Sequence, residues 1–257
     1  MNSLQSITPV GIVAHRGYAA AYPENTLPAI KAAVDAGVVA VEVDIQFSRD
    51  GVPLLLHDAD IGCIASTNNK VFETNIADIK KIAICEREKC AGRSTDVFYC
   101  TLDEFADYLR QTPKLQVFVE IKQKGIDLFG AAYVIMQLEQ SLKNVREQCI
   151  IISYSADFLK NVHLQTVFPI GYILTFWDDK NLKEAYSLQP EFVICNHTKI
   201  PENTNFREFA WQWLLFEITD CDQMYFYADR GVQWVESMDP VKLLECLRKN
   251  NSDEYDI

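Results

Sequence analysis

The stretch of sequence that decides the fold covers residues 41–58 and reads VEVDIQFSRDGVPLLLHD. It holds two β-rich runs on either side of Asp50-Gly51, a pair that commonly marks a hairpin turn. Only the four residues 48–51 separate the runs, which is too short for the crossover helix that joins parallel strands. We therefore expect residues 52–57, the hairpin arm, to fold back antiparallel on the preceding strand and to return His57 to a place beside Glu42.

The first of the two runs carries two acidic residues at alternate positions. In a strand, Glu42 and Asp44 point to one face, while Val41, Val43 and Ile45 point to the other. Two carboxylates that face a barrel interior repel each other and lose hydration, so they need a cation or a shared proton. A solvated acidic face on an edge strand is the alternative, and the hydrophobic flanks of the run argue against it.

The rest of the chain alternates short β-rich runs with longer amphipathic runs, which is typical of an α/β protein. No repeat or linker divides the 257 residues, so we expect one domain over residues 1–257. Without the hairpin arm, eight parallel strands remain. The predicted fold is a single (β/α)8 barrel of TIM type with an added β-hairpin arm after strand 2.

Expected boundaries follow from these patterns. A helix over residues 26–36 begins with a cap at Asn25 and Thr26. A second helix over residues 128–142 carries one apolar stripe. The expected strands cover residues 11–14, 38–47, 52–56, 116–121, 150–154, 170–175, 192–195, 213–218 and 232–235.

Composition excludes several classes of protein. A net charge of -12 opposes binding to a phosphate backbone, so we expect no nucleic-acid partner. No apolar run approaches the roughly 18 residues of a membrane helix, which leaves only peripheral contact with lipid. The first ten residues do not resemble a secretory signal, so the expected location is cytoplasmic.

The chain has eight cysteines, and we expect them to be reduced thiols because a chain of this size does not need disulfides. Cys85, Cys90 and Cys100 lie close together, but they lack paired CxxC spacing and a neighbouring histidine. They therefore make a poor zinc site.

A third carboxylate comes from another strand. Glu120 and Lys122 lie on one face of the run from 117 to 122, with apolar residues on the other face. Together with Glu42 and Asp44, Glu120 offers an oxygen-rich site that suits a hard divalent cation, Mg2+ or Ca2+. A surface ion pair between Glu120 and Lys122 is the alternative for this motif alone.

Two histidines stand at expected strand ends. His15 and Arg16 stand at the end of the first strand, and His57 stands at the end of the hairpin arm. We therefore expect all three at the same end, or mouth, of the barrel, with both imidazoles facing solvent. Phosphodiester cleavage needs a base, an acid and positive charge around the phosphoryl oxygens. His15 and His57 can supply the first two, and Arg16, Lys122 and the cation the third.

The other two histidines lie away from such strand ends. His163 falls in a helical run and His197 in a polar loop, so we interpret both as structural or solvated.

These motifs resemble the glycerophosphodiester phosphodiesterase family, which belongs to the phosphatidylinositol phospholipase C-like TIM-barrel phosphodiesterases. The resemblance is specific because several motifs recur in order within about 45 residues, and it continues more weakly to the C-terminal segment. The motifs are His15-Arg16-Gly17, Pro23-Glu24-Asn25-Thr26-Leu27, Glu42-Val43-Asp44, Asp50-Gly51, His57-Asp58 and Glu120-Ile121-Lys122.

The resemblance implies an activity and a set of roles. Members of the family hydrolyse glycerophosphodiesters to glycerol 3-phosphate and an alcohol, by internal attack of the neighbouring glycerol hydroxyl to give a cyclic phosphate that water opens. The implied roles are cation binding for Glu42, Asp44 and Glu120, acid/base catalysis for His15 and His57, and phosphate contact for Arg16 and Lys122.

Two alternatives remain at this point. A lysophospholipase D or a sphingomyelinase D-like enzyme would use the same residues on a lipid substrate. A non-catalytic phosphate-binding barrel is the other alternative, and the intact set of catalytic residues argues against it.

The last strands depart from the family pattern of Trp-Thr-Val-Asn, Gly-Val-Asp and Thr-Asp-x-Pro. Glu217 stands in place of Thr and adds a negative charge near the mouth, which suits a cationic alcohol such as choline or ethanolamine. The corresponding residues here are Phe216-Glu217-Ile218-Thr219, Gly231-Val232-Gln233 and Ser237-Met238-Asp239-Pro240.

Overall fold

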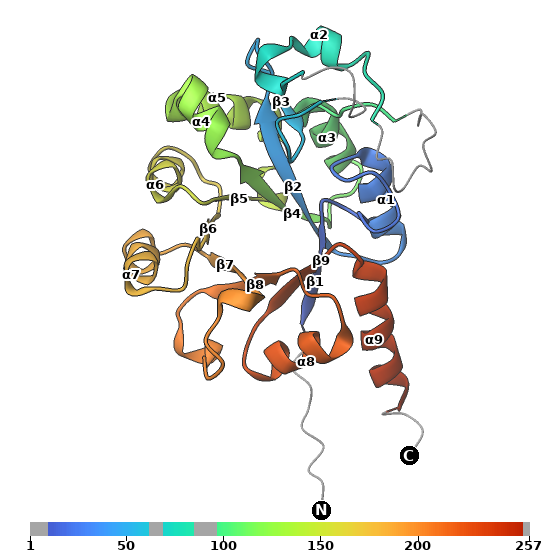
Figure 1. Ribbon diagram of the computed structural model, residues 1–257, viewed down its shortest axis with the longest axis vertical. Helices are drawn as coiled ribbons and strands as arrows, with labels where there is room; N and C mark the ends of the chain where they lie inside the picture. The colour runs from blue at the N-terminus through green and yellow to red at the C-terminus, as the bar shows by residue number, and fades with distance from the viewer. Residues whose placement is uncertain (1–9, 62–68, 85–96, 254–257) are drawn as a thin grey trace, which may run out of the picture.

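The computed structural model describes residues 10–61, 69–84 and 97–253, and its strands form one sheet that closes into a barrel (Figure 1). The strand order is β1-β9-β8-β7-β6-β5-β4-β2-β3, and β1 also pairs with β2, which closes a ring of eight parallel strands. The strands are β1 Gly11–His15, β2 Ala40–Phe47, β3 Pro53–Leu55, β4 Gln116–Ile121, β5 Cys149–Ser153, β6 Ile170–Ile173, β7 Phe192–Asn196, β8 Gln212–Phe216 and β9 Trp234–Ser237.

Helices lie between successive strands and surround the ring, so the predicted (β/α)8 barrel is confirmed (Figure 1). The α-helices of the described residues are α1 Leu27–Asp35, α2 Ile76–Ile79, α3 Leu102–Leu109, α4 Gln123–Phe129, α5 Ala131–Leu142, α6 Ala156–Gln165, α7 Asp179–Leu188, α8 Cys221–Asp229 and α9 Pro240–Asp253. Four short 3-10 helices are η1 Val71–Glu73, η2 Arg146–Gln148, η3 His197–Lys199 and η4 Phe206–Glu208.

The hairpin arm lies outside the ring, as predicted. β3 pairs antiparallel with β2, and Leu55 lies opposite Ile45. Asp50 Oδ1 stabilises the turn by accepting hydrogen bonds from the Ser48 hydroxyl at 2.7 Å and the Ile76 backbone N–H at 2.9 Å. The register carries His57 to the level of Val43, one residue from the predicted level of Glu42.

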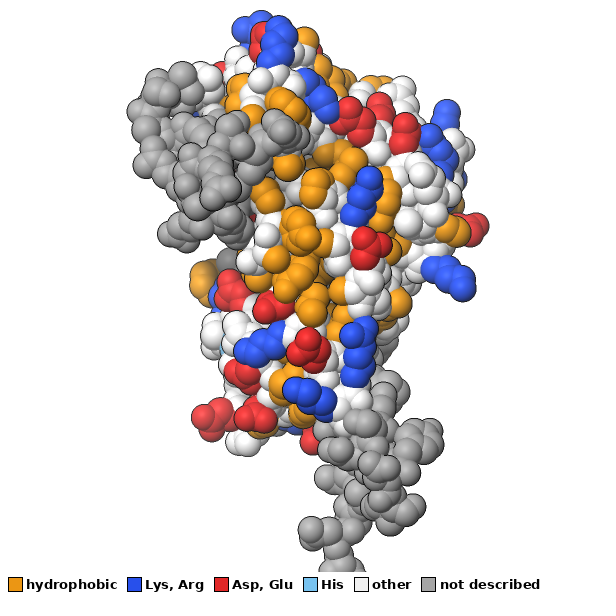
Figure 2. Space-filling model, turned by 90° about the vertical axis from the view of Figure 1, so that its right-hand side faces the viewer, with side chains coloured by type: hydrophobic (Ala, Val, Ile, Leu, Met, Phe, Trp, Pro, Cys, Tyr) orange, Lys and Arg blue, Asp and Glu red, His pale blue; other side chains and the backbone are white. Residues whose placement is uncertain are grey.

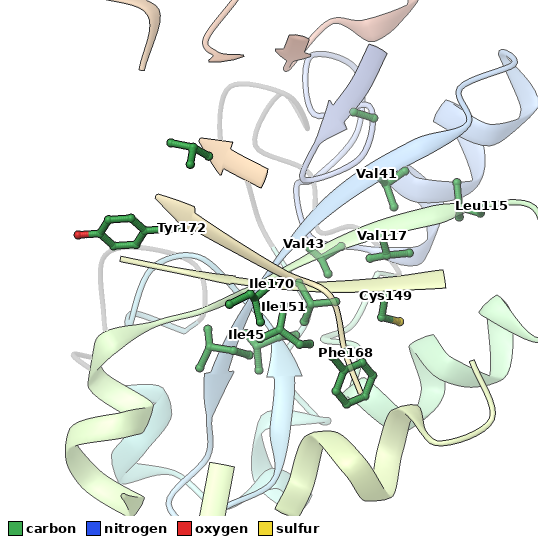
Figure 3. Packing of buried hydrophobic residues seen from close by; sticks show 14 of the residues in the cluster. Val41, Val43, Ile45, Leu115, Val117, Cys149, Ile151, Phe168, Ile170 and Tyr172 are labelled. Carbon is green, nitrogen blue, oxygen red and sulfur yellow. The ribbon is translucent and has the colours of Figure 1, made fainter. Parts of the chain in front are cut away.

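The outward-facing residues of the ring strands pack under the helices. Val41, Val43 and Ile45 of β2 are fully buried in one cluster with residues of β4, β5 and β6 and of helices α3, α5 and α6 (Figure 3). Burial of this face explains why these strands read as apolar at every second position. The same alternation directs Glu42 and Asp44 into the ring.

The inward-facing apolar residues fill the part of the barrel near the N-terminal ends of the strands. Phe118 packs edge-on against Phe192 with ring centroids 5.1 Å apart, and both belong to a separate buried cluster with Val13. Gly11 leaves room for the Trp234 ring, because a Cβ atom there would lie 2.3 Å from it. Packed layers of this kind leave space for a ligand only towards the C-terminal ends of the strands.

Two local expectations were wrong. The predicted helix over residues 128–142 is broken at Gly130, whose φ of 79° separates α4 from α5. The expected state of the cysteines fails for Cys221 and Cys246, which form a disulfide between α8 and α9. Cys100, Cys149 and Cys195 are buried free thiols, whereas Cys85 and Cys90 lie outside the described residues.

None of the described helices combines the length and apolar character that a bilayer crossing requires. On the face drawn in Figure 2, acidic and basic side chains are interspersed, and hydrophobic side chains gather in the middle. The basic side chains on this face do not form a continuous stripe.

Candidate active site

The turn after β1 holds an unusual backbone conformation. Arg16 and Gly17 have φ angles of 58° and 82°. A Cβ atom at Gly17 would lie 2.7 Å from the carbonyl carbon of Ala29 in α1, so the close approach of turn and helix requires glycine. The turn leaves His15 only 9% exposed, which corrects the expectation that its imidazole faces solvent.

Asn25 ties the segment before α1 to β2. Its Nδ2 donates a hydrogen bond to Asp44 Oδ2 at 2.8 Å, and the Asp44 backbone N–H donates to Asn25 Oδ1 at 3.0 Å. The φ of 55° at Asn25 lies in a region that asparagine tolerates better than most residues. The side chain of Thr26, not that of Asn25, caps α1 by accepting a hydrogen bond from the Ala29 N–H. Asn25 is therefore a site residue that the helix-cap interpretation missed.

Two cationic side chains surround Asp44. Lys122 Nζ lies 2.5 Å from Asp44 Oδ1 and 2.7 Å from Glu120 Oε1, because the parallel register of β2 and β4 places Glu120 beside Asp44. Arg16 Nε lies 3.2 Å from Asp44 Oδ2, and its Nη1 donates to both oxygens of Glu24 at 3.0 Å. The predicted ion pair between Glu120 and Lys122 therefore forms, but it is largely buried and it includes Asp44, so it is not a separate surface pair.

Two further carboxylates face the interior from β2 and β9. Glu42 is 2% exposed, and its Oε2 accepts a hydrogen bond from the Arg16 backbone N–H at 3.2 Å. Glu42 Oε1 has no hydrogen-bond partner among the described residues. Glu236 of β9 is 3% exposed, and its Oε1 lies 3.2 Å from His15 Nε2.

Sequence reasoning missed Glu236. The signal was present, because strand alternation places Glu236 on the same inward face as Trp234 in a run that is otherwise short of charge. Its place in the site depends on the register of β1 and β9, which sets Glu236 beside Val13, two residues before His15.

The hairpin arm delivers His57 to the same region. Gln46 Nε2 donates a hydrogen bond to the His57 backbone carbonyl at 2.9 Å, which fixes the end of the arm to β2. His57 Nδ1 lies 2.9 Å from Asp58 Oδ1, so the aspartate orients the imidazole. The side chain of His57 is 33% exposed, in contrast to that of His15.

Six of the seven predicted site residues line one pocket of about 310 Å³. The pocket lies at the C-terminal ends of the ring strands, which we call the mouth of the barrel. Asp44 does not line the pocket itself; it contacts the pocket residues Arg16 and Lys122. Neither His163 nor His197, which we interpreted as structural or solvated, lines this pocket. The lining consists of His15, Arg16, Glu42, His57, Glu120, Lys122, Ile152, Tyr154, Ile173, Ile194, Phe216, Glu217 and Glu236.

The buried carboxylates differ in their affinity for protons. Burial and the neighbouring Asp44 raise the pKa of Glu42 well above its usual value, and the same two causes raise the pKa of Glu236 to about 8. Burial also raises the pKa of Glu120, although Lys122 opposes it. Burial acts on Asp44 too, but Lys122 and Arg16 outweigh it and lower the pKa of this carboxyl. Asp44 is thus the carboxylate most firmly held in its ionised form.

The basic groups of the site respond in opposite directions. Burial and the nearby Arg16 lower the pKa of His15 to about 3, so its imidazole is neutral near pH 7. Burial opposes the charge of Lys122, but Asp44 and Glu120 more than compensate and raise its pKa. Lys122 therefore remains an ammonium group that can contact a phosphate.

The donor set fits a hard divalent cation. Ligand atoms of Glu42, Asp44 and Glu120 all lie within 4.8 Å of one another, and so do those of His15, Glu42 and Glu236. Oxygen ligands of this kind are preferred by Mg2+ and Ca2+. The unpartnered Glu42 Oε1 is a buried oxygen that such a cation would satisfy.

Comparison with known proteins agrees with this arrangement. Residues 15–236 match the model of the Glycerophosphoryl diester phosphodiesterase family. The chain belongs to this family. Its named relatives are phosphoric diester hydrolases, and the family resemblance and the enzyme class predicted from the sequence are confirmed.

Two relatives in this family align along most of the chain. The glycerophosphodiester phosphodiesterase of Caldanaerobacter subterraneus subsp. tengcongensis is 27% identical over 93% of this chain and 98% of its own length. Glycerophosphodiester phosphodiesterase 1 of Bos taurus is 34% identical over 91% of this chain and 80% of its own.

Solved structures share the fold at lower identity. A phosphodiesterase of Oleispira antarctica, solved in complex with the product sn-glycerol-3-phosphate, superposes with a TM-score of 0.81 at 20% identity over 93% of this chain and 96% of its own. The glycerophosphodiester phosphodiesterase of Thermotoga maritima gives a TM-score of 0.69 at 22% identity over 93% and 98%.

Proposed function

We propose that this enzyme hydrolyses small glycerophosphodiesters to glycerol 3-phosphate and an alcohol. The observation that carries the proposal is the convergence of His15, His57, Arg16 and Lys122 on one pocket beside the buried carboxylates. The family supports the reaction type, and the product-bound relative supports a glycerol phosphate substrate. A pocket of about 310 Å³ lies at the small end of the roughly 300–1,000 Å³ typical of ligand pockets, which favours head-group-sized substrates.

In this proposal Glu42, Asp44 and Glu120 would hold one Mg2+ or Ca2+ ion through carboxylate oxygens. The bound cation supplies positive charge to the phosphoryl oxygens. Lys122 would shift from the two carboxylates towards the phosphate, and Arg16 would contact the same group while it stays paired with Glu24.

The two imidazoles divide the proton transfers. His15 is neutral near pH 7 and can accept the proton of the attacking glycerol hydroxyl. His57, oriented by Asp58, can donate a proton to the leaving alkoxide oxygen. The roles reverse when water opens the cyclic phosphate.

The test is a panel of substrates with purified protein. Glycerophosphocholine, glycerophosphoethanolamine, glycerophosphoinositol and lysophosphatidylcholine are each incubated with Mg2+, Ca2+ or a chelator. Released glycerol 3-phosphate is measured for the first three, and released lysophosphatidic acid for the last. The proposal predicts release from the first three with a divalent cation and little reaction in chelator. Reaction with lysophosphatidylcholine alone would favour the lysophospholipase D alternative, and no reaction with any substrate would favour a non-catalytic barrel.

A further inference from the structure

The charges at the mouth do not balance. Four inward carboxylates, those of Glu42, Asp44, Glu120 and Glu236, face the cationic side chains of Arg16 and Lys122. Fully ionised, this set carries two negative charges in excess, and Arg16 is also shared with Glu24. Buried uncompensated charge is costly, so the site in its ionised form requires about two positive charges from elsewhere.

The excess is localised on one side of the cluster. Lys122 lies between Asp44 and Glu120, and Arg16 lies on the other oxygen of Asp44. Within the described part of the chain, neither Glu42 nor Glu236 forms an ion pair with a lysine or arginine side chain. The two carboxylates that lack a cationic partner are therefore those of β2 and β9.

Geometry brings these two groups together. Ligand atoms of Glu42, Glu236 and His15 lie within 4.8 Å of one another, and Glu42 belongs to this group as well as to the group with Asp44 and Glu120. Both glutamates are at most 3% exposed. Glu42 Oε1, buried and without a partner among the described residues, is an independent sign that a ligand is bound between the strands.

We propose that Glu236 is a further ligand of the divalent cation, which it shares with Glu42, so that the cation lies on the β9 side of the cluster. This inference rests on the proposed function and adds a ligand to its cation site. A divalent cation placed there neutralises the two-charge excess and satisfies Glu42 Oε1. Glu236 can bind the cation and keep its contact with His15, because His15 Nε2 contacts one oxygen of Glu236 and leaves the other oxygen for the cation.

The test measures cation binding rather than turnover. Chelator-stripped protein is titrated with Ca2+ and with Mg2+ in a calorimeter, for the wild type and for Glu236→Gln, which keeps the shape of the side chain and removes its charge. We expect one cation per chain in the wild type and a dissociation constant raised by about ten- to a hundredfold in Glu236→Gln, similar to the loss caused by altered ligand supports in other metal sites. Glu208→Gln is the matched control, because Glu208 is exposed and does not line the pocket, and the cation affinity of this variant should equal that of the wild type.

A second readout separates ligation from a structural role. In chelator, Glu236→Gln should unfold at the same temperature as the wild type or higher, because the neutral amide fills the space of the carboxyl group and adds no negative charge to the cluster. A marked loss of stability in chelator would assign Glu236 to the support of His15 and would overturn the proposal.

A structure with Mn2+ gives a decision that does not depend on any variant. An anomalous peak within about 2.6 Å of a Glu236 oxygen supports the proposal, and a peak bound only by Glu42, Asp44 and Glu120 overturns it. Unchanged affinity in Glu236→Gln together with weakened affinity in Glu42→Gln would overturn the role of Glu236 and leave the proposed function standing. A wild type that binds no cation would contradict both.

Discussion

The two histidines of the site differ in their surroundings although both stand at strand ends. His15 is enclosed by Arg16, Glu42 and Glu236, whereas His57 is partly exposed and held by Asp58. One imidazole is thus kept neutral by burial, and the other remains accessible to solvent. This difference suits two residues that exchange protons with opposite oxygens of one phosphodiester.

His15→Ala and His57→Ala should each lower kcat by about two to four orders of magnitude, the usual contribution of a positioned acid or base. Steady-state hydrolysis of glycerophosphocholine measures the effect, and circular dichroism checks that the barrel is formed. His163→Ala, on the exposed surface of α6, is the control and should retain full activity. Near wild-type turnover in both site variants would contradict the acid/base assignment.

Glu217 belongs to the outer part of the pocket. It is exposed, has a φ of 65°, and accepts a hydrogen bond from Asn196 Nδ2 at 2.6 Å. A non-glycine residue in this region is strained, and such strain often accompanies function. We propose that the carboxylate attracts a cationic alcohol group, as the sequence suggested.

Glu217→Gln should lower kcat/KM for glycerophosphocholine by roughly fivefold, because an exposed ion pair contributes up to about 1 kcal/mol. Glycerophosphoinositol lacks a cationic alcohol and serves as the matched substrate, with kcat/KM unchanged. Equal effects on both substrates would show that Glu217 does not discriminate between charged and neutral alcohol groups.

At the scale of elements, the sequence predicted those parts whose signals are local. Asp50-Gly51 predicted the antiparallel arm, and alternation around Glu42 predicted the inward carboxylates. The break at Gly130 was missed because the apolar stripe continues across it in sequence while the backbone does not. Glu236 was missed because its role depends on the pairing of β1 with β9, the first and last strands, which no local pattern encodes.

A disulfide joins α8 to α9, although the size of the chain led us to expect reduced cysteines. The Cys221–Cys246 disulfide closes a sequence separation of 25 residues and lies outside the residues that line the pocket. Cross-links that close loops of this length stabilise proteins by about 3 kcal/mol.

Replacement of both cysteines by serine, or reduction of the wild type, should therefore lower Tm by several degrees while kcat at 25 °C stays close to wild type. Differential scanning calorimetry measures the first and steady-state kinetics the second. A Tm that does not respond to reductant, with both thiols alkylated in the untreated protein, would contradict the disulfide.

At the scale of the whole molecule, the barrel concentrates negative charge at its mouth while the net charge of the chain is already -12. Without a cation, stability should depend on pH in a defined direction. The pKa of Glu236 is raised to about 8, so its contribution is complete below about 4.5 and is lost as the pH rises through 8. The pKa of His15 is lowered to about 3, so its contribution is complete above about 6.5 and is lost at lower pH.

Between pH 6.5 and 8 the contribution of His15 is constant, so the change comes from the buried glutamates whose pKa values are raised, Glu236 and Glu42 among them. In chelator, the free energy of unfolding should therefore fall as the pH rises across this window, by up to about 1.4 kcal/mol per pH unit for one proton. Urea unfolding at several pH values measures it. Saturating Ca2+ should abolish the fall, because the cation replaces the proton. A stability that rises with pH in chelator would contradict the buried, uncompensated carboxylates.

The central claim is that a cation held by the inward carboxylates is required for phosphodiester hydrolysis at the mouth of the barrel. Its most direct test is the rate of glycerol 3-phosphate release from glycerophosphocholine as a function of cation concentration, for chelator-stripped wild type and Glu42→Gln. We expect no turnover without cation, saturable activation of the wild type, and activation of Glu42→Gln only at cation concentrations at least about tenfold higher. Full turnover of the wild type in chelator, or identical activation curves for both proteins, would contradict it.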